Sequence, residues 1–250
     1  MPVKHLTVSL LVLGLAFAAP AGAGSDEAVL AAHAAYRNGE AGKLARHAQA
    51  FEGHVLAPWF EYWRLKLRLE EAATPDIHDF LARHVGSYLA DRLRADWLKV
   101  LGKRADWARF GQEFAPLTLE DRDVRCYALA ARLVNEDRSA LEEAQKVWLQ
   151  PRALGEGCEA AAEQMTNLGA LPPALVWARA RALASERRVG DAQRALASLP
   201  QGQRPPDSTA AAALRQPEAY LAKFASRPEP GHGRQLAVLA MLRLAAAEPD

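Results

Sequence analysis

The chain has 250 residues, in which 31 lysines and arginines stand against 30 aspartates and glutamates, and it has only two cysteines. This balanced charge provides no general electrostatic attraction to nucleic acid or to an anionic membrane surface, so neither is expected as a partner. About a fifth of the residues are alanine and isoleucine occurs once, at Ile77. Such a composition favours helices and argues against a protein built on β-sheets.

The first 23 residues have the pattern of an export signal. Lys4 precedes an apolar run over residues 6–19, and Ala-Gly-Ala at 21–23 offers the small residues that signal peptidase accepts. A buried N-terminal helix or an uncleaved anchor is the alternative interpretation. We expect a cleavable signal over 1–23, a mature chain from Gly24 and a periplasmic location. No cysteine follows the cleavage region and no later segment approaches about 20 apolar residues, so no membrane anchor is expected after cleavage.

Beyond the signal, apolar residues recur at the helical spacing i, i+3, i+4, most clearly over 59–69, 89–101 and 129–134. No segment has the pattern of a strand, a turn and a second strand. Glycine, proline and Asn/Asp positions divide the chain into short helices joined by short loops. The predicted breaks lie at 38–39, 53–58, 74–76, 85–87, 102–103, 115–116, 135–137, 151–157, 169–173, 189–190, 200–206, 216–217 and 228–233.

Two segments, 36–45 and 177–192, have the apolar, Gly-acidic turn layout of tetratricopeptide-like helix hairpins. The repeats are degenerate, so the pattern predicts an α-solenoid without a strict period. We therefore expect an all-α fold in which residues 24–250 form one stack of short helix hairpins. Residues 200–207 are the best candidate for a linker, and we interpret them as a loop within the stack.

Cys126 and Cys158 are expected to be bonded to each other, because thiols in an oxidising compartment usually pair. Two buried thiols that pack as small apolar groups are the alternative. A metal site lacks the remaining ligands of a tetrahedral shell, and a redox pair lacks the Cys-x-x-Cys spacing. The predicted disulfide is structural and pins a helical hairpin.

No arrangement of side chains indicates a catalytic site. The adjacent glutamates at 70–71 and at 142–143 point about 100° apart on a helix, so neither pair shares one site. Glu61 lies among aromatic residues, where burial of its carboxyl group is conceivable, but a helix-surface position is favoured. The His-Glu-x-x-His pattern of zinc hydrolases and the Gly-x-Ser-x-Gly pattern of serine hydrolases are both missing from the sequence. We expect no catalytic residue, no cofactor and no metal in this chain.

One aromatic and one basic cluster allow two interpretations each. Trp59, Tyr62 and Trp63 have the geometry either of a platform for sugar rings or of a core seam between helices, and their helical spacing favours the core. A basic stretch could attract anionic peptides of the cell wall, although interspersed aspartates favour a solvated face. Its members are Arg92, Arg94, Lys99, Lys103 and Arg104.

Several segments together resemble the N-terminal region of soluble lytic murein transglycosylases. They are Ala-Pro-Trp-Phe-Glu-Tyr-Trp at 57–63, the segment 80–98 that ends in a basic helix with Trp-Leu, the short helix at 104–107, and Val-Trp-Leu at 147–149 between the two cysteines. Cys126 and Cys158 themselves resemble the paired cysteines of this family. No one motif is specific, but their order and spacing together are.

This resemblance implies an α-superhelical region, part of a larger ring-shaped domain that holds a lysozyme-like catalytic domain. The enzymes of the family are periplasmic lyases that cleave the β-1,4 bond between N-acetylmuramic acid and N-acetylglucosamine in peptidoglycan and leave 1,6-anhydro ends. One glutamate acts as acid and then as base. The Glu-Ser, Gly-Leu-Met-Gln and Ala-Tyr-Asn-Ala-Gly signatures of the catalytic domain do not occur here. By itself this chain is therefore predicted to be inactive.

Two functions remain open at this point. In the first, residues 24–250 are the scaffold region of such an enzyme, with peptidoglycan strands and the enzyme's own catalytic domain as partners. In the second, the chain is a stand-alone periplasmic helical-repeat protein that binds other proteins. The apolar helix expected over 235–247 favours the first, because its apolar face calls for another helix beside it.

Overall fold

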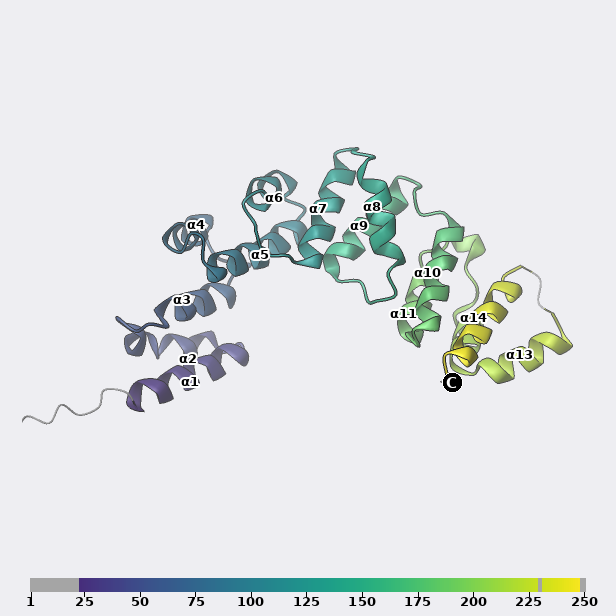
Figure 1. Cartoon of the computed structure of the whole chain (residues 1–250), viewed down its shortest axis with the longest axis horizontal. Helices are drawn as coiled ribbons and strands as arrows, with labels where there is room; N and C mark the ends of the chain where they lie inside the picture. Colours follow the sequence, from purple (N-terminus) through teal and green to yellow (C-terminus); the bar gives the residue numbers. More distant parts are fainter. Residues whose placement is uncertain (1–22, 229–230, 248–250) are drawn as a thin grey trace, which may run out of the picture. The chain divides into compact units, whose positions relative to one another are not determined.

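The computed structural model describes residues 23–228 and 231–247, and within these ranges it consists of helices and loops (Figure 1). The predicted all-α fold is confirmed. No helix in the described ranges has the length and apolar character needed to cross a membrane. The export signal predicted over 1–23 lies outside the described residues except for Ala23.

The chain divides between His84 and Val85 into two compact units. In the first unit, α1 and α2 form the hairpin predicted over 36–45, and both contact α3, which in turn contacts α4. The bounds are α1 Ala23–Arg37, α2 Ala41–Ala45, the 3-10 helix η1 Ala48–Phe51, α3 Ala57–Lys66 and α4 Thr74–Arg83.

In the second unit, most helices pack on helices one or two places along the chain, and α10 also packs on α14, four places along. α7 packs on α9, α10 on α11 and α14, and α13 on α14. The bounds are α5 Tyr88–Lys103, α6 Trp107–Phe114, α7 Arg122–Val134, α8 Ala140–Leu149, α9 Glu156–Asn167, α10 Pro173–Ser185, α11 Val189–Leu196, the 3-10 helix η2 Gln201–Gln203, α12 Asp207–Arg215, α13 Pro217–Ser226 and α14 Gly233–Ala245. The α10–α11 pair is the second predicted hairpin.

One continuous hydrophobic core runs through the second unit from α7 to α14. Leu133, Val176, Leu183, Leu214 and Leu239 are all buried in it. Residues 200–207, the linker candidate, lie between two helices of this core, so they are a loop within the unit as predicted. α14 packs its buried stripe on α10, α12 and α13. The apolar face of this helix, which was predicted to need another helix beside it, is therefore largely covered by α10, α12 and α13.

Helix starts follow the local signals in the sequence. The side chains of Ser87, Asp106 and Asp121 accept hydrogen bonds from the first free backbone N–H groups of α5, α6 and α7. Proline occupies the first turn of α3, α4, α10 and α13, where its missing N–H costs no hydrogen bond. The helix start predicted at 74–76 is confirmed.

Several helices end at a residue in the left-handed conformation. Gly39 and Gly86 have φ of 72° and 75° just beyond α1 and α4, as the predicted breaks there require. Ala105, Glu136 and Arg187 take the same conformation after α5, α7 and α10, with φ between 54° and 60°. The residue types at these three positions do not predict a left-handed conformation.

Two of the predicted breaks are displaced from the observed ones. Gly102 lies inside α5, and α5 ends only at Lys103. A Cβ atom on Gly102 would lie 2.5 Å from the ring of Tyr127, so glycine is needed there for close packing. Likewise Gly190 belongs to the first turn of α11, and the chain turns before it, at Arg187.

Candidate functional site

The aromatic cluster of α3 is mainly a core seam. Tyr62 and Trp63 are 4% and 6% exposed, and only Trp59, at 37%, reaches the surface. The Trp63 ring stacks on Tyr36 of α1, with 5.6 Å between centroids. A three-ring platform for sugars is therefore not formed, and the core interpretation holds.

Glu61 lies at the surface between α3 and α4. Its Oε2 atom is 2.7 Å from Nη1 of Arg83 and 3.3 Å from Nε2 of His84. This ion pair joins the two helices and agrees with the favoured helix-surface interpretation. It does not form the enclosed carboxyl that acid catalysis requires.

Glu142 and Glu143 diverge, as expected for neighbours on a helix. Glu142 pairs along α8 with Lys146 at 2.6 Å, whereas Glu143 pairs across to Arg125 of α7 at 3.1 Å. The other pair, at 70–71, was expected on a helix but lies in turns beyond the end of α3, and its side chains are exposed. The pair on α8 does not present two carboxyl groups to one substrate.

The basic stretch on α5 is partly neutralised. Arg94 pairs with Glu113 of α6, and both side chains are largely buried. Lys99 donates to Asp121, the N-cap of α7, at 2.5 Å. These two cations tie α5 to its neighbours, so the stretch is not an open cationic surface.

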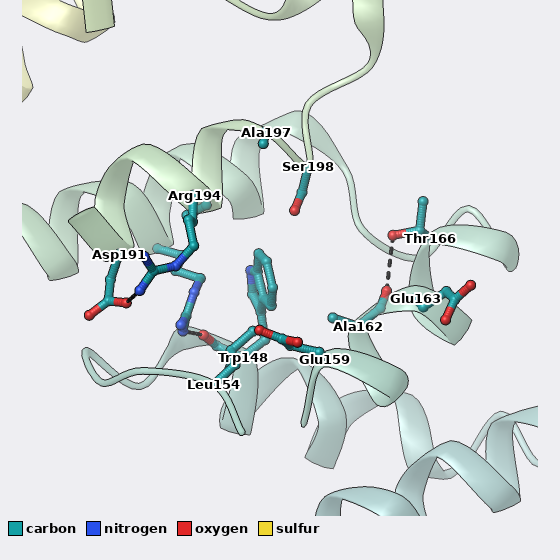
Figure 2. A pocket seen from close by; sticks show the side chains of 12 residues that line it. Trp148, Leu154, Glu159, Ala162, Glu163, Thr166, Asp191, Arg194, Ala197 and Ser198 are labelled. Carbon is teal, nitrogen blue, oxygen red and sulfur yellow. Dashed lines mark hydrogen bonds and ion pairs between the residues drawn. The ribbon is translucent and has the colours of Figure 1, made fainter. Parts of the chain in front are cut away.

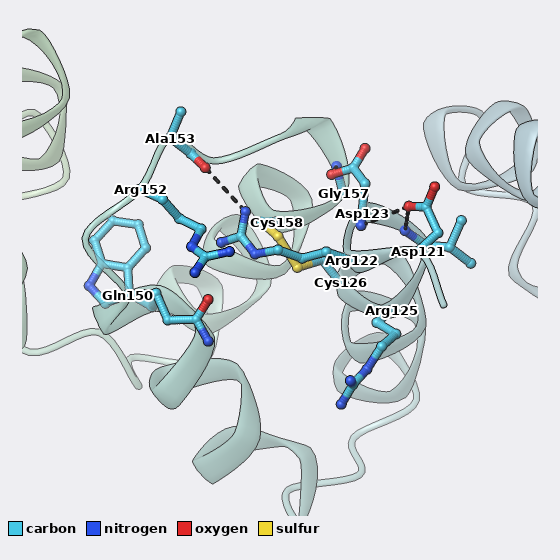
Figure 3. Close-up of a disulfide and its surroundings, with 12 residues drawn as sticks. Asp121, Arg122, Asp123, Arg125, Cys126, Gln150, Arg152, Ala153, Gly157 and Cys158 are labelled. Atoms are coloured by element: carbon cyan, nitrogen blue, oxygen red, sulfur yellow. Dashed lines mark hydrogen bonds between the residues drawn. A yellow bond between two sulfur atoms is a disulfide. The ribbon is translucent and has the colours of Figure 1, made fainter. Parts of the chain in front are cut away.

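Cys126 of α7 and Cys158 of α9 form a disulfide, with 4.7 Å between their Cα atoms (Figure 3). Both residues are buried. The bridge does not pin a simple hairpin, because α8 lies between the two helices in sequence. It joins two helices that also pack directly on each other, close to the segment 150–155 that leads from α8 to α9.

A cleft with a volume of about 540 Å³ lies between α8–α9 and α10–α11 (Figure 2). Trp148 stands at its centre, with Glu159, Glu163 and Thr166 from α9 on one side and Asp191, Arg194 and Ser198 on the other. Grooves between helix pairs are common places for ligand sites. This cleft is the best candidate functional site by shape.

Arg179 of α10 forms part of the cleft wall and is only 3% exposed. Its guanidinium donates to the backbone carbonyls of Trp148, Gln150 and Arg152, the latter two at 2.9 Å. It also lies over the Trp148 ring, 4.7 Å from the centroid. Burial lowers the pKa of Arg179 to about 10, so it is charged at neutral pH. Arg179 thereby satisfies carbonyls at the end of α8, where a cation is favoured.

The charged groups on the rim of the cleft are of two kinds. Asp191 is bound by Arg188 at 2.7 Å and by Arg194; burial raises its pKa, but these two guanidiniums lower it by more. Glu159 and Glu163 lie one turn apart on α9 and are exposed. A glycosidic general acid needs a carboxyl with a raised pKa, whereas the pKa of Asp191 is lowered by its two arginine partners. The cleft is suited to binding and offers no catalytic pair.

Sequence reasoning missed Arg179, although a signal was present. Val176, Ala180 and Leu183 are fully buried, and Arg179 falls on the same stripe of α10. A charged residue on an apolar stripe indicates a buried partner set, because an unpaired buried charge is costly. Its partners are backbone carbonyls on another helix, which sequence spacing does not show.

A metal centre is not supported by the described part of the chain, where no group of three His, Cys, Asp or Glu side chains converges.

Comparisons with known proteins give a likeness in structure only. No protein-family model and no curated protein matches the sequence. Two crystal structures of a 70-kDa soluble lytic transglycosylase, one from Escherichia coli and one in complex with bulgecin A, superpose with a TM-score of 0.61 and 16% identity. In each, the match covers 90% of this chain and 36% of the other. An inactive mutant of the lytic transglycosylase Slt from Pseudomonas aeruginosa matches with a TM-score of 0.56 and 21% identity, over 87% and 35%.

The chain has the α-superhelical fold of soluble lytic transglycosylases. The resemblance inferred from the sequence motifs is thus supported at the level of the fold. At these sequence identities the comparison shows a shared fold and nothing beyond it. The chain spans 36% of the length of the first solved chains it matches.

Proposed function

We propose that this chain is a helical scaffold region of a periplasmic lytic transglycosylase, and that it holds a catalytic domain and controls which peptidoglycan strands reach it. The reaction would be cleavage of the MurNAc–GlcNAc β-1,4 bond with formation of 1,6-anhydro ends. This chain would contribute positioning to that reaction and no reacting group.

The observation that carries the proposal is the structural match over 90% of the chain to transglycosylases. The sequence motifs point to the same family independently of the structure. The side chains agree with a scaffold role, since Glu61, Glu142 and Glu143 are all engaged in surface ion pairs. The export signal predicted over 1–23 accords with a substrate in the periplasm.

A stand-alone helical-repeat protein that binds other proteins is the second candidate. The cleft between α8–α9 and α10–α11 favours it, because helix-hairpin stacks often bind partners in such grooves. The two candidates differ in the size of the native protein and in whether it carries lytic activity.

The test is an immunoblot of the native periplasmic fraction with antibodies raised against residues 24–250, combined with a renaturing gel that contains peptidoglycan. We expect one reactive band well above the 27.2 kDa of this chain, toward the 70 kDa of the matched enzyme, and clearing of peptidoglycan at the same position. A strain that lacks the gene serves as the control and should lose both signals.

Purified residues 24–250 should release no anhydromuropeptides from sacculi, as measured by chromatography and mass spectrometry against a mock preparation. A reactive band no larger than 27.2 kDa without clearing would favour the stand-alone protein. Release of anhydromuropeptides by residues 24–250 would contradict a pure scaffold.

A further inference from the structure

A second cavity, of about 390 Å³, lies beside the disulfide between α7, α8 and the segment 150–155. Three arginines line it, Arg122, Arg125 and Arg152, together with three carboxylates from Glu120, Asp121 and Glu143. Cys126, Leu129 and Val147 add apolar surface.

The guanidinium group of Arg122, the first residue of α7, has one edge whose N–H groups have no hydrogen-bond acceptor. Its Nη1 donates to the carbonyl of Ala153 at 3.2 Å, while Nε and Nη2 are buried and have no hydrogen-bond partner. These two nitrogens form the side of the guanidinium that binds a carboxylate through two parallel hydrogen bonds. A buried donor pair without an acceptor is costly, so its retention points to a ligand that supplies one.

Arg152 presents a second cation to the same place. Its side chain is exposed and forms no ion pair or hydrogen bond within the described residues. Figure 3 shows its guanidinium end turned toward that of Arg122. Burial first, and then repulsion by Arg152, lowers the pKa of Arg122. Two like charges held together without an anion between them are unfavourable, and an anion would relieve this repulsion.

The segment that carries Arg152 is held rigidly, which favours binding because little ordering remains to be done. Arg179 donates to its carbonyls at Gln150 and Arg152. At its far end the N–H of Gly157 donates to Oδ1 of Asp123 at 2.9 Å, and the disulfide lies one residue further on. Arg152 therefore projects from a fixed backbone.

Two of the three carboxylates of the cavity are already paired with cations. Asp121 is bound by Lys99, and Glu143 is bound by Arg125 and lies 3.7 Å from Arg132. With these two pairs set aside, the wall holds Arg122 and Arg152 against Glu120, a surplus of one positive charge, which is too small for a dianion such as phosphate. A single carboxylate matches both the charge and the planar fork of Arg122.

We propose that Arg122 and Arg152 form a binding site for a carboxylate borne on a small apolar group, such as the C-terminus of a short peptide. The carboxylate accepts two hydrogen bonds from Nε and Nη2 of Arg122, and the apolar group lies toward Leu129 and Val147. The exposed Arg152 side chain turns outward to admit the ligand and then closes on it. This site is independent of the scaffold function proposed above.

The test is a titration of ¹⁵N-labelled residues 24–250 with N-acetylalanine, followed through the Nε–H signals of arginine. We expect saturable binding that shifts one buried Arg Nε–H signal, and none with N-acetylalaninamide, which has the same shape without the charge. Arg152→Gln should weaken binding about tenfold, because it removes one charged partner. Arg122→Lys should do the same, because lysine cannot form the planar fork.

Arg125→Gln is the matched control, since Arg125 lines the same cavity but is committed to Glu143. It should leave binding unchanged. Arg152→Gln alters an exposed side chain, so the test stands even if Arg122→Lys fails to fold. Equal binding of the amide, equal weakening by Arg125→Gln, tighter binding of inorganic phosphate, or no saturable binding of N-acetylalanine would each overturn the proposal.

Discussion

Tyr127 is the residue on which the packing of α5, α7 and α9 depends. Its ring is buried, and glycines on both neighbouring helices leave room for it. A Cβ atom at Gly157 would lie 2.8 Å from the ring and 2.2 Å from the backbone oxygen of Asp123. At Gly102 the corresponding distance to the ring is 2.5 Å. These two glycines are needed for close approach between helices and not for chain reversal.

Gly102→Ala should therefore destabilise the protein by about 1–3 kcal/mol, because the added methyl group overpacks the contact with Tyr127. The measurement is urea denaturation followed by far-UV circular dichroism. Gly111→Ala is the control: Gly111 lies in α6 with open space around its Cβ position, so alanine should stabilise by about 0.5–1 kcal/mol. An unchanged denaturation midpoint in Gly102→Ala would show that the two helices separate at no cost.

Burial raises the pKa of Tyr127 to about 12, and nearby carboxylates, Glu156 first, contribute to the rise. Because the folded pKa exceeds the unfolded value of 10.0, the neutral ring adds stability that is complete below pH 10 and is lost as pH rises toward 12. Between pH 9 and pH 11 the wild type should therefore lose more stability than Tyr127→Phe. Tyr88→Phe, at an exposed tyrosine, should behave as the wild type. Equal losses in all three proteins would contradict this assignment.

At the scale of elements, the disulfide and Arg179 hold the segment between α8 and α9. The bridge spans a sequence separation of 32, and its two half-cystines lie on helices that also pack directly. Arg179 binds the other end of the segment. The segment is thus fixed at both ends although it has no regular structure.

Replacing both Cys126 and Cys158 by alanine should lower the free energy of unfolding by about 3–4 kcal/mol, because the unfolded chain gains the freedom of a long loop. Urea denaturation of the variant and of the oxidised wild type measures the difference. The reductant dithiothreitol should lower the stability of the wild type and leave the variant unchanged. Two free thiols titrating in the unreduced, denatured wild type would show instead that the bridge is absent.

At the scale of the whole molecule, the second unit contains a complete core. The hydrophobic cluster from α7 to α14, the disulfide and both cavities lie within residues 85–247. A unit with its own core is able to fold alone.

We therefore expect residues 85–250, expressed alone, to keep the disulfide and to unfold in one cooperative thermal transition. Far-UV circular dichroism during heating measures this transition. Residues 24–250 are the control, and their transition should include that of the fragment. A fragment that melts gradually would mean that the first unit is required for this core.

The sequence by itself determined the all-α fold, most helix boundaries and the choice of the two cysteines, because capping residues, prolines and apolar spacing act within a few residues along the chain. It also carried the resemblance that the structural comparison supports at the level of the fold. Only the tertiary structure decided that Gly102 serves packing, that Arg179 is buried beneath Trp148, and that Arg122 and Arg152 face each other. Those contacts join residues 25 to 31 positions apart, and only the folded packing of the helices brings such residues together.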